Sequence, residues 1–133
     1  MAIDRDFSIK QRGKLGEQYT CEYLKNHGYN IVQTNYSSRF GEIDIIAEND
    51  KYIVFTEVKT ANPNSFTKGF ERITKSKIRK FTKTAVTYLT RYRITKQPRI
   101  DCAEVIVNEK DNSLIDIHYI ENAVDDWGYD IIE

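Results

Sequence analysis

The chain has 133 residues, 40% of them hydrophobic and 30% charged, which suffices for one domain with a sizeable core and excludes an intrinsically disordered protein. No stretch approaches the roughly 18 uncharged apolar residues of a membrane helix, and the charged N-terminus lacks the apolar region of a secretory signal. Two cysteines cannot build a disulfide framework. We therefore expect a reduced, cytoplasmic protein that forms a single domain over residues 1–133.

The net charge of zero conceals two oppositely charged segments. Residues 68–99 hold 11 Lys and Arg against the single Glu71, a local net charge of +10. Residues 100–133 hold one Lys against 10 Asp and Glu, a local net charge of −9. This segregation indicates an anionic partner, an acidic flank that competes for the same basic patch, or both.

The hydrophobic pattern predicts two helices and five strands in the order α-β-β-β-α-β-β. Two of the strands are close enough in sequence to form a hairpin. The alternation of elements predicts an α/β protein with a mixed central sheet flanked by helices. In chain order we expect a helix at residues 8–27, strands at 30–36, 42–47 and 52–59, a helix at 70–92, and strands at 99–107 and 114–120.

The second predicted helix has an apolar stripe and a basic face. The stripe consists of Phe70, Ile73, Phe81, Ala85, Tyr88, Leu89 and Tyr92. The basic residues are Arg72, Lys75, Lys77, Arg79, Lys80, Lys83 and Arg91, followed by Arg93, Lys96 and Arg99. A solvated helix face usually includes acids, so their near absence favours a surface that binds nucleic acid, DNA or RNA, through its phosphates. No base-reading motif is present, which indicates recognition independent of sequence.

Lys77 lies four residues from both Ile73 and Phe81, on the apolar stripe of this helix. Its ammonium could therefore reach across to an acidic cluster or to a phosphate. The alternative is that its stem packs on the apolar residues while the charge reaches solvent.

The predicted strand at 52–59 carries two charges in an otherwise apolar run. Because side chains alternate between faces, Glu57 and Lys59 share one face with Phe55. The predicted hairpin would bring Asp44 beside Glu57, and two adjacent carboxylates repel each other unless a cation joins them. The alternative is that Lys59 forms an ion pair with Glu57 or Asp44 that neutralises their charges and has no role beyond structure.

A third carboxylate, Glu17, is in line with Gly13 and Cys21 on the first predicted helix and can face the sheet. Gly13 and Gly16 weaken a helix, which makes sense if its backbone approaches something closely. Three carboxylates would form a cluster of hard oxygen ligands that suits Mg²⁺ or Mn²⁺. The alternative for Glu17 is an exposed helix charge.

Glu17, Asp44 and the Glu57-Val58-Lys59 triplet together resemble the signature of the PD-(D/E)XK nuclease superfamily, and the helical Glu resembles that of archaeal Holliday-junction resolvases. More closely, the chain resembles the YraN-like family of small bacterial proteins. The matching stretches are GKLGEQYTCEYLKNHGYNIVQTNY (13–36), GEIDIIA (41–47), FTEVKT (55–60), RIDCAEV (99–105) and HYIENAV (118–124), together with Lys77.

The resemblance implies a restriction-endonuclease-like fold and a metal-dependent endonuclease that hydrolyses phosphodiester bonds in structured or branched DNA. Asp44, Glu57 and the Val58 carbonyl would hold Mg²⁺ or Mn²⁺, and Glu17 would be a further ligand, directly or through water. Lys59 would orient the attacking water or stabilise the transition state. Symmetric cleavage of a junction would also require a homodimer.

Three positions depart from the family pattern: Ala61 stands where an Arg is common, Ile100 interrupts R-F-D, and Val124 replaces a Phe. The loss at Ala61 affects substrate contact or charge stabilisation rather than metal binding. This departure leaves a second hypothesis open, in which the protein has the nuclease fold and binds DNA or RNA but has little or no catalytic activity. A third reading is an assembly factor whose basic helix contacts RNA or ribosomes.

The acidic tail at residues 121–133 could fold back on the basic helix, contact another subunit or be disordered. Trp127, Ile131 and Ile132 favour docking. The two histidines, His27 and His118, are too scattered for a zinc site.

Overall fold

The computed structural model describes residues 5–63, 74–125 and 127, and in this part of the chain the elements follow the predicted order. The second helix starts later than predicted, at Lys75, and residues 70–73 lie outside the described residues. The bounds are α1 Arg5–Asn26, β1 Asn30–Ser38, β2 Gly41–Glu48, β3 Tyr52–Ala61, α2 Lys75–Arg91, β4 Gln97–Val107 and β5 Leu114–Ile120.

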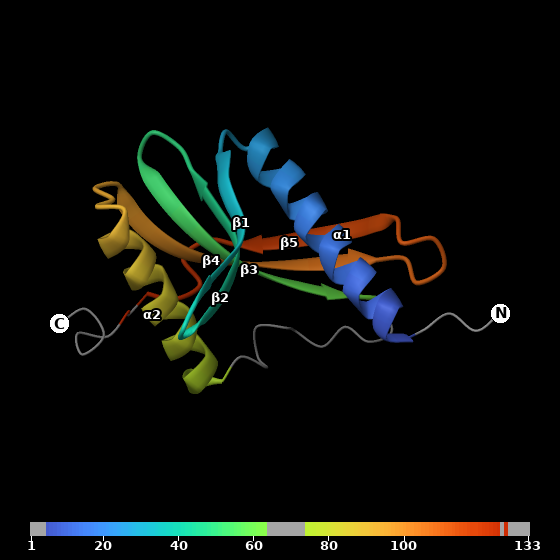
Figure 1. The fold of residues 1–133 in the computed structure, drawn as a ribbon. Helices are drawn as coiled ribbons and strands as arrows, with labels where there is room; N and C mark the ends of the chain where they lie inside the picture. Colours follow the sequence, from blue (N-terminus) through green and yellow to red (C-terminus); the bar gives the residue numbers. More distant parts are fainter. Residues whose placement is uncertain (1–4, 64–73, 126, 128–133) are drawn as a thin grey trace.

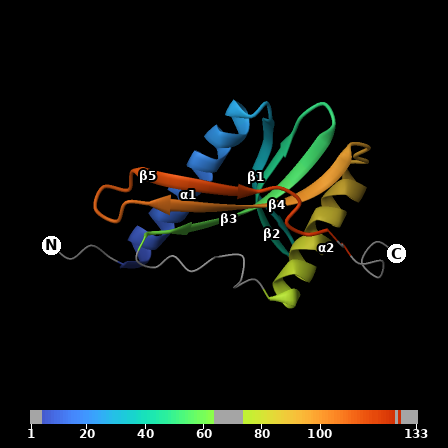
Figure 2. The same cartoon turned by 180° about the vertical axis from the view of Figure 1, so that it is seen from behind.

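The strands form one mixed sheet in the order β1-β2-β3-β4-β5. Neighbours are antiparallel except β3 and β4, which run parallel. Helices α1 and α2 flank the sheet on its two sides (Figure 1), as the view from behind also shows (Figure 2). This confirms the predicted mixed α/β architecture.

Alternation along the central strands supplies a core on both faces of the sheet. Phe55 packs with Tyr88 of α2, their ring centroids 5.8 Å apart. On the other face Val54 packs with Leu24 of α1. Strand β3 is therefore covered on both sides, as its sequence predicted.

The apolar stripe of α2 ends earlier than its periodicity suggested. Tyr92, predicted as the last residue of the stripe, is the C-cap of the helix and is 49% exposed, so the buried stripe does not reach it. Trp127 and Val124 of the tail do pack against the α2-side core, which confirms docking for this part of the tail. Ile131 and Ile132 lie outside the described residues.

One of the two glycines in α1 marks a close approach. A Cβ at Gly16 would collide with Thr60 of β3, whereas a Cβ at Gly13 would have no atom within 4 Å. Close packing of the helix on the sheet therefore explains Gly16 but not Gly13.

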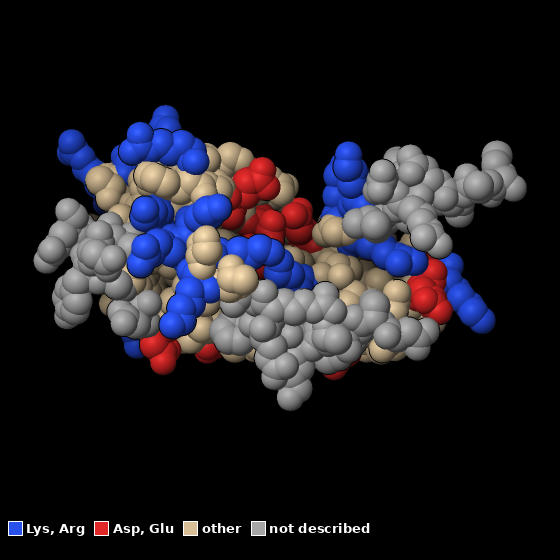
Figure 3. Space-filling view, turned by 90° about the horizontal axis from the view of Figure 1, so that it is seen from below, with Lys and Arg blue, Asp and Glu red and all other residues tan. Residues whose placement is uncertain are grey.

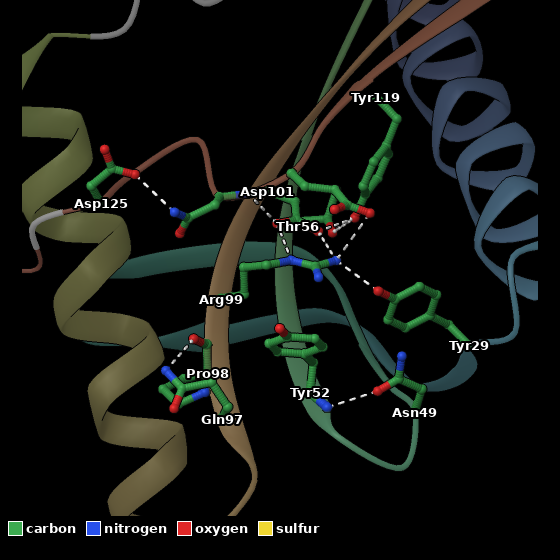
Figure 4. A network of polar contacts seen from close by, with 12 residues as sticks. Tyr29, Asn49, Tyr52, Thr56, Gln97, Pro98, Arg99, Asp101, Tyr119 and Asp125 are labelled. Carbon is green, nitrogen blue, oxygen red and sulfur yellow. Dashed lines mark hydrogen bonds and ion pairs between the residues drawn. The ribbon is translucent and has the colours of Figure 1, made fainter.

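A buried polar network joins strands that are distant in sequence (Figure 4). Arg99, 8% exposed, donates through Nε and Nη2 to the two oxygens of Asp101, at 2.8 and 2.9 Å. Asp101 also accepts from the Tyr119 hydroxyl at 2.6 Å and from the Asn122 N–H at 2.9 Å. Arg99 further donates to the Tyr29 hydroxyl. Arg99 therefore belongs to the core, and its prediction as part of a basic surface was wrong.

This network fixes the protonation states of its members. Burial opposes the charge of Arg99, but the hydrogen bonds to Asp101 and Tyr29 raise its pKa above the usual value. Burial and the neighbouring Asp101 carboxylate raise the pKa of Tyr119, so its phenol stays a donor. The pair is a fully hydrogen-bonded buried ion pair, the form in which buried charge is tolerated.

Within the described residues, neither helix is both long enough and apolar enough to cross a membrane.

The two glycines give a matched test of helix packing. We expect Gly16→Ala to lower the free energy of unfolding by about 1–3 kcal/mol, because the methyl group overpacks against Thr60. Gly13→Ala should instead raise it by up to about 1 kcal/mol through helix propensity. Urea unfolding of the two variants measures both, and equal effects would contradict the close approach.

Removing the central carboxylate should be costly. Asp101→Ala leaves the Arg99 charge buried without its partner, so we expect a loss of about 3–5 kcal/mol in unfolding free energy. Asp125→Ala removes an exposed carboxylate that only accepts from the Asn122 amide and should cost less than about 1 kcal/mol. If Asp101→Ala does not fold, Tyr119→Phe should still lose about 1 kcal/mol.

Candidate active site

The candidate site lies where strands β2 and β3 stop pairing. Their last ladder pair in this direction is Ile45 with Thr56, so Asp44 and Glu57 are the next two residues, opposite each other. The Asp44 carboxylate accepts a hydrogen bond from the Val58 N–H at 2.8 Å. A side chain thus bridges the strands where the backbone ladder has ended, and it holds one carboxylate beside another.

This placement raises the pKa of Asp44 from its usual range to about 7. Burial is the largest cause and the nearby Glu57 charge the next, while the hydrogen bond from Val58 opposes them. Glu17 adds to the rise and Lys59 reduces it. Burial and the neighbouring carboxylates therefore outweigh the effect of Lys59 on the Asp44 pKa.

Lys59 contacts Glu57, with 3.1 Å between Nζ and Oε1. Both side chains are partly exposed, at 37% and 27%. The ion pair considered as the alternative from sequence is thus present. It engages one oxygen of Glu57, and among the described residues no ion pair to Asp44 is formed.

Glu17 lies on the α1 side of the same region. Asn35, which has a positive φ of 54°, donates a long hydrogen bond of 3.4 Å to its carboxylate. Burial raises the pKa of Glu17, with Glu42 and Glu57 adding to the rise. In the described part of the chain, however, no three Asp, Glu, His or Cys side chains converge closely enough to hold a metal ion. Glu17 is thus an electrostatic neighbour of the pair rather than a third side chain in contact with it.

A cavity of about 230 Å³ opens beside Glu57 and Lys59, between the sheet and α2. Lys77 and Lys80 of α2 line it together with apolar side chains. Lys77 therefore faces the same space as Glu57. Seen from below, acidic side chains gather in the middle of the molecule, beside Lys and Arg side chains on the α2 side (Figure 3).

The predicted basic surface is present in part. Lys75, Lys77, Arg79 and Lys80 are exposed on α2, and Arg72 lies outside the described residues. The half-buried Lys83 lies over the Phe40 ring, with its Nζ 5.4 Å from the centroid. Lys96 pairs with Glu48 at 3.3 Å.

Two acidic features near the site were not identified from sequence as site residues. Glu104, 4% exposed, is in register with Lys59 across the β3–β4 ladder, and His118 Nδ1 lies 3.7 Å from it. Asp101 at the wall of the cavity is the centre of the network above. The sequence signal for both is that an acid interrupts the apolar run 100–107. That pattern does not tell which strand will pair with this one.

Cys102 lines the cavity beside Glu57. Burial and the charges of Glu104 and Glu57 raise the pKa of its thiol to about 12. The thiol is therefore protonated at neutral pH, and nucleophilic chemistry of a thiolate is disfavoured.

Fold and site together define a mixed α/β protein with two opposed carboxylates and a lysine at the end of a central strand. The profile of the uncharacterised protein family UPF0102 matches residues 16–105. A UPF0102 protein of Persephonella marina is 42% identical over 115 residues, 86% of this chain and 93% of the relative. One from Sulfurihydrogenibium is 42% identical over 114 residues, 85% and 93%.

A third relative, from Legionella pneumophila, is 34% identical over 116 residues, 87% of this chain and 96% of its own. The chain belongs to the UPF0102 family, which confirms the resemblance to the YraN-like family drawn from the sequence. The names of these relatives state no activity.

The raised pKa of Asp44 gives a stability test that needs no substrate. Asp44 holds its proton more tightly in the folded protein than in the unfolded chain. Its contribution to the free energy of unfolding is therefore lost as pH rises from about 4 through about 7. Asp44→Asn keeps the acceptor for Val58 and removes the charge, so at pH 8 it should be more stable than wild type by about 1 kcal/mol or more.

Thermal unfolding between pH 4 and 8 in EDTA measures this effect. Glu42→Gln removes an exposed carboxylate from the same strand and serves as the control, with little expected change. A wild-type pH profile identical to that of Asp44→Asn would contradict the assignment.

Proposed function

We propose that this protein is a metal-dependent endonuclease of the PD-(D/E)XK type, folded as one domain, that hydrolyses phosphodiester bonds in structured or branched DNA. The observation that carries the proposal is the position of Asp44 opposite Glu57, with Lys59 in contact, where β2 and β3 separate. Charge of this kind beside a cavity is typical of functional sites.

The donor set fits a hard divalent ion. Mg²⁺ is commonly held by one or two carboxylates and keeps several waters, so Asp44 and Glu57, with the Val58 carbonyl, are sufficient. Glu17 would act through water, since no third acidic side chain converges with the pair in the described part of the chain. When bound, such an ion would lower the pKa of the attacking water and neutralise charge on the scissile phosphate.

Lys59 has a role that differs from that of the acids. Its ammonium now contacts Glu57, and it also faces the cavity. If Glu57 bound a metal ion instead, the Lys59 ammonium would be available to hold the attacking water or to stabilise the charge that develops on the phosphate. Lys77, across the cavity, would bind the adjacent phosphate.

The exposed lysines of α2 extend this positive surface away from the site. Phosphate contacts of this kind are independent of sequence and sensitive to salt. They would position a DNA strand so that one phosphate reaches the carboxylate pair.

One observation favours the second candidate, a nucleic-acid-binding module with little activity. Glu57 already has a cation in contact, and Ala61, where related sequences commonly carry an Arg, ends β3 beside Ile106. In that case the basic surface would act without turnover.

Cleavage of a labelled panel of single strand, duplex, flap, four-way junction and structured RNA in Mg²⁺ or Mn²⁺ tests the proposal. We expect products with wild type and a loss of at least about 100-fold in Glu57→Ala and Lys59→Ala. Asp116→Asn removes an exposed carboxylate of β5 that does not line the cavity, so it is the matched control and should retain activity. Salt-sensitive binding without cleavage would select the binding module.

The basic surface has its own test. Lys75→Ala combined with Lys80→Ala should weaken DNA binding for every sequence and reduce the slope of log K against log salt concentration by about 1–2. Lys96→Ala removes a lysine that is paired with Glu48 and should change the slope little. Fluorescence anisotropy from low to moderate salt gives both slopes, and equal slopes would contradict this surface.

A further inference from the structure

The cavity beside Glu57 has a composition that phosphate binding does not require. Its charged lining residues are Lys59, Lys77 and Lys80 and the acids Glu42, Glu57 and Asp101. Much of the remaining lining is apolar and partly aromatic, with Phe40, Phe81 and Val124. A phosphate needs only positive charge and hydrogen-bond donors. The apolar side chains would therefore contact another, apolar part of a ligand.

Phe40 is well placed to form a stacking surface. It lies in the two-residue turn between β1 and β2, where its N–H donates to Ser38 Oγ at 3.1 Å. The Arg39 guanidinium carbon is 4.8 Å and Lys83 Nζ is 5.4 Å from its ring centroid. An aromatic ring among cations is the combination that proteins use to hold unpaired nucleotides.

The size of the cavity limits what can enter. At about 230 Å³ it is smaller than the usual range of ligand pockets, which begins near 300 Å³. It therefore suits one small group rather than a larger ligand, and the Phe40 ring in its lining favours a planar one. Because Glu57 and Lys59 line the same cavity, a base held there keeps its own phosphate next to the carboxylate pair.

We propose that this cavity receives one unpaired DNA base, stacked on Phe40, and that the substrate therefore contains an unstacked nucleotide at the cleavage point. The proposal rests on the proposed nuclease function and narrows its substrate class to single-stranded stretches, flaps and branches. Continuous duplex is disfavoured because a base must leave the stack before it can enter.

The test uses the intact protein in EDTA, so that binding is measured without turnover. Fluorescence anisotropy gives the affinity for a single-stranded 12-mer, the same sequence as duplex, and a 12-mer made only of abasic sites. We expect wild type to bind the single strand about 10-fold or more tightly than the abasic strand, as base–aromatic stacking would give.

Phe40→Ala and Phe40→Leu should each lose that preference and leave duplex binding unchanged. The leucine variant keeps apolar volume and removes the aromatic face, so it reports stacking even if the alanine variant is unstable. Tyr92→Ala removes an aromatic ring that is 49% exposed at the end of α2 and does not line the cavity. It should bind the single strand as wild type does.

Equal affinities for the normal and abasic strands, or equal effects of the Phe40 and Tyr92 variants, would overturn the base site. Metal-dependent cleavage that disappears in Glu57→Ala would still support the nuclease in that case. Conversely, a preference that depends on Phe40 without any cleavage in Mg²⁺ or Mn²⁺ would retain the base site and reject the nuclease.

Discussion

The buried carboxylate of Asp101 holds this structure together. Its oxygens accept four hydrogen bonds, two from Arg99, one from Tyr119 and one from the Asn122 N–H. These partners come from β4, β5 and the segment that follows β5, so one side chain links β4 to the end of β5 and to the segment behind it. The bond from Asn122 also places the next residues, including Val124, at the wall of the cavity. The interior of the sheet and the shape of the candidate site therefore depend on the same ion pair.

The candidate site differs from this network, because its carboxylates have fewer hydrogen-bond donors and lie beside one another. Asp101 is buried with every oxygen satisfied, whereas Asp44 is placed beside Glu57 with one backbone donor and a pKa raised to about 7. Such an arrangement costs folding free energy, and proteins retain costs of this kind mainly at functional sites. The separation of β2 and β3 after Ile45 makes room for it, since a continued ladder would press the two strands together. The buried network and the candidate site thus lie on neighbouring strands. Strand β3 contributes to both, through Thr56 and Glu57.

Local patterns were sufficient for the elements and for the hairpin that sets Asp44 opposite Glu57, because side-chain alternation and turn residues act over short distances. They were insufficient wherever two distant segments had to meet. Arg99 follows a run of basic residues and was interpreted as surface, but its partner on β4 and Tyr29 draw it into the core. Gly13 and Gly16 look alike in sequence, and only the position of Thr60 distinguishes them. Glu17, Asp44 and Glu57 were candidates from sequence, but Asp101 and Glu104 beside them were not identified, and neither was the separation of Glu17 from the other two.

The sequence by itself determined the order of elements, the segregation of charge and the family, since each of these is written in residue types and their spacing. Tertiary structure decided which charges are buried and paired, which face the cavity, and that Phe40, Lys77 and Lys80 line one space with Glu57. The physical reason is that burial and electrostatic interaction depend on through-space distance and on exclusion of water. Both are set by the packing of the two helices on the sheet, which spacing along the chain does not encode.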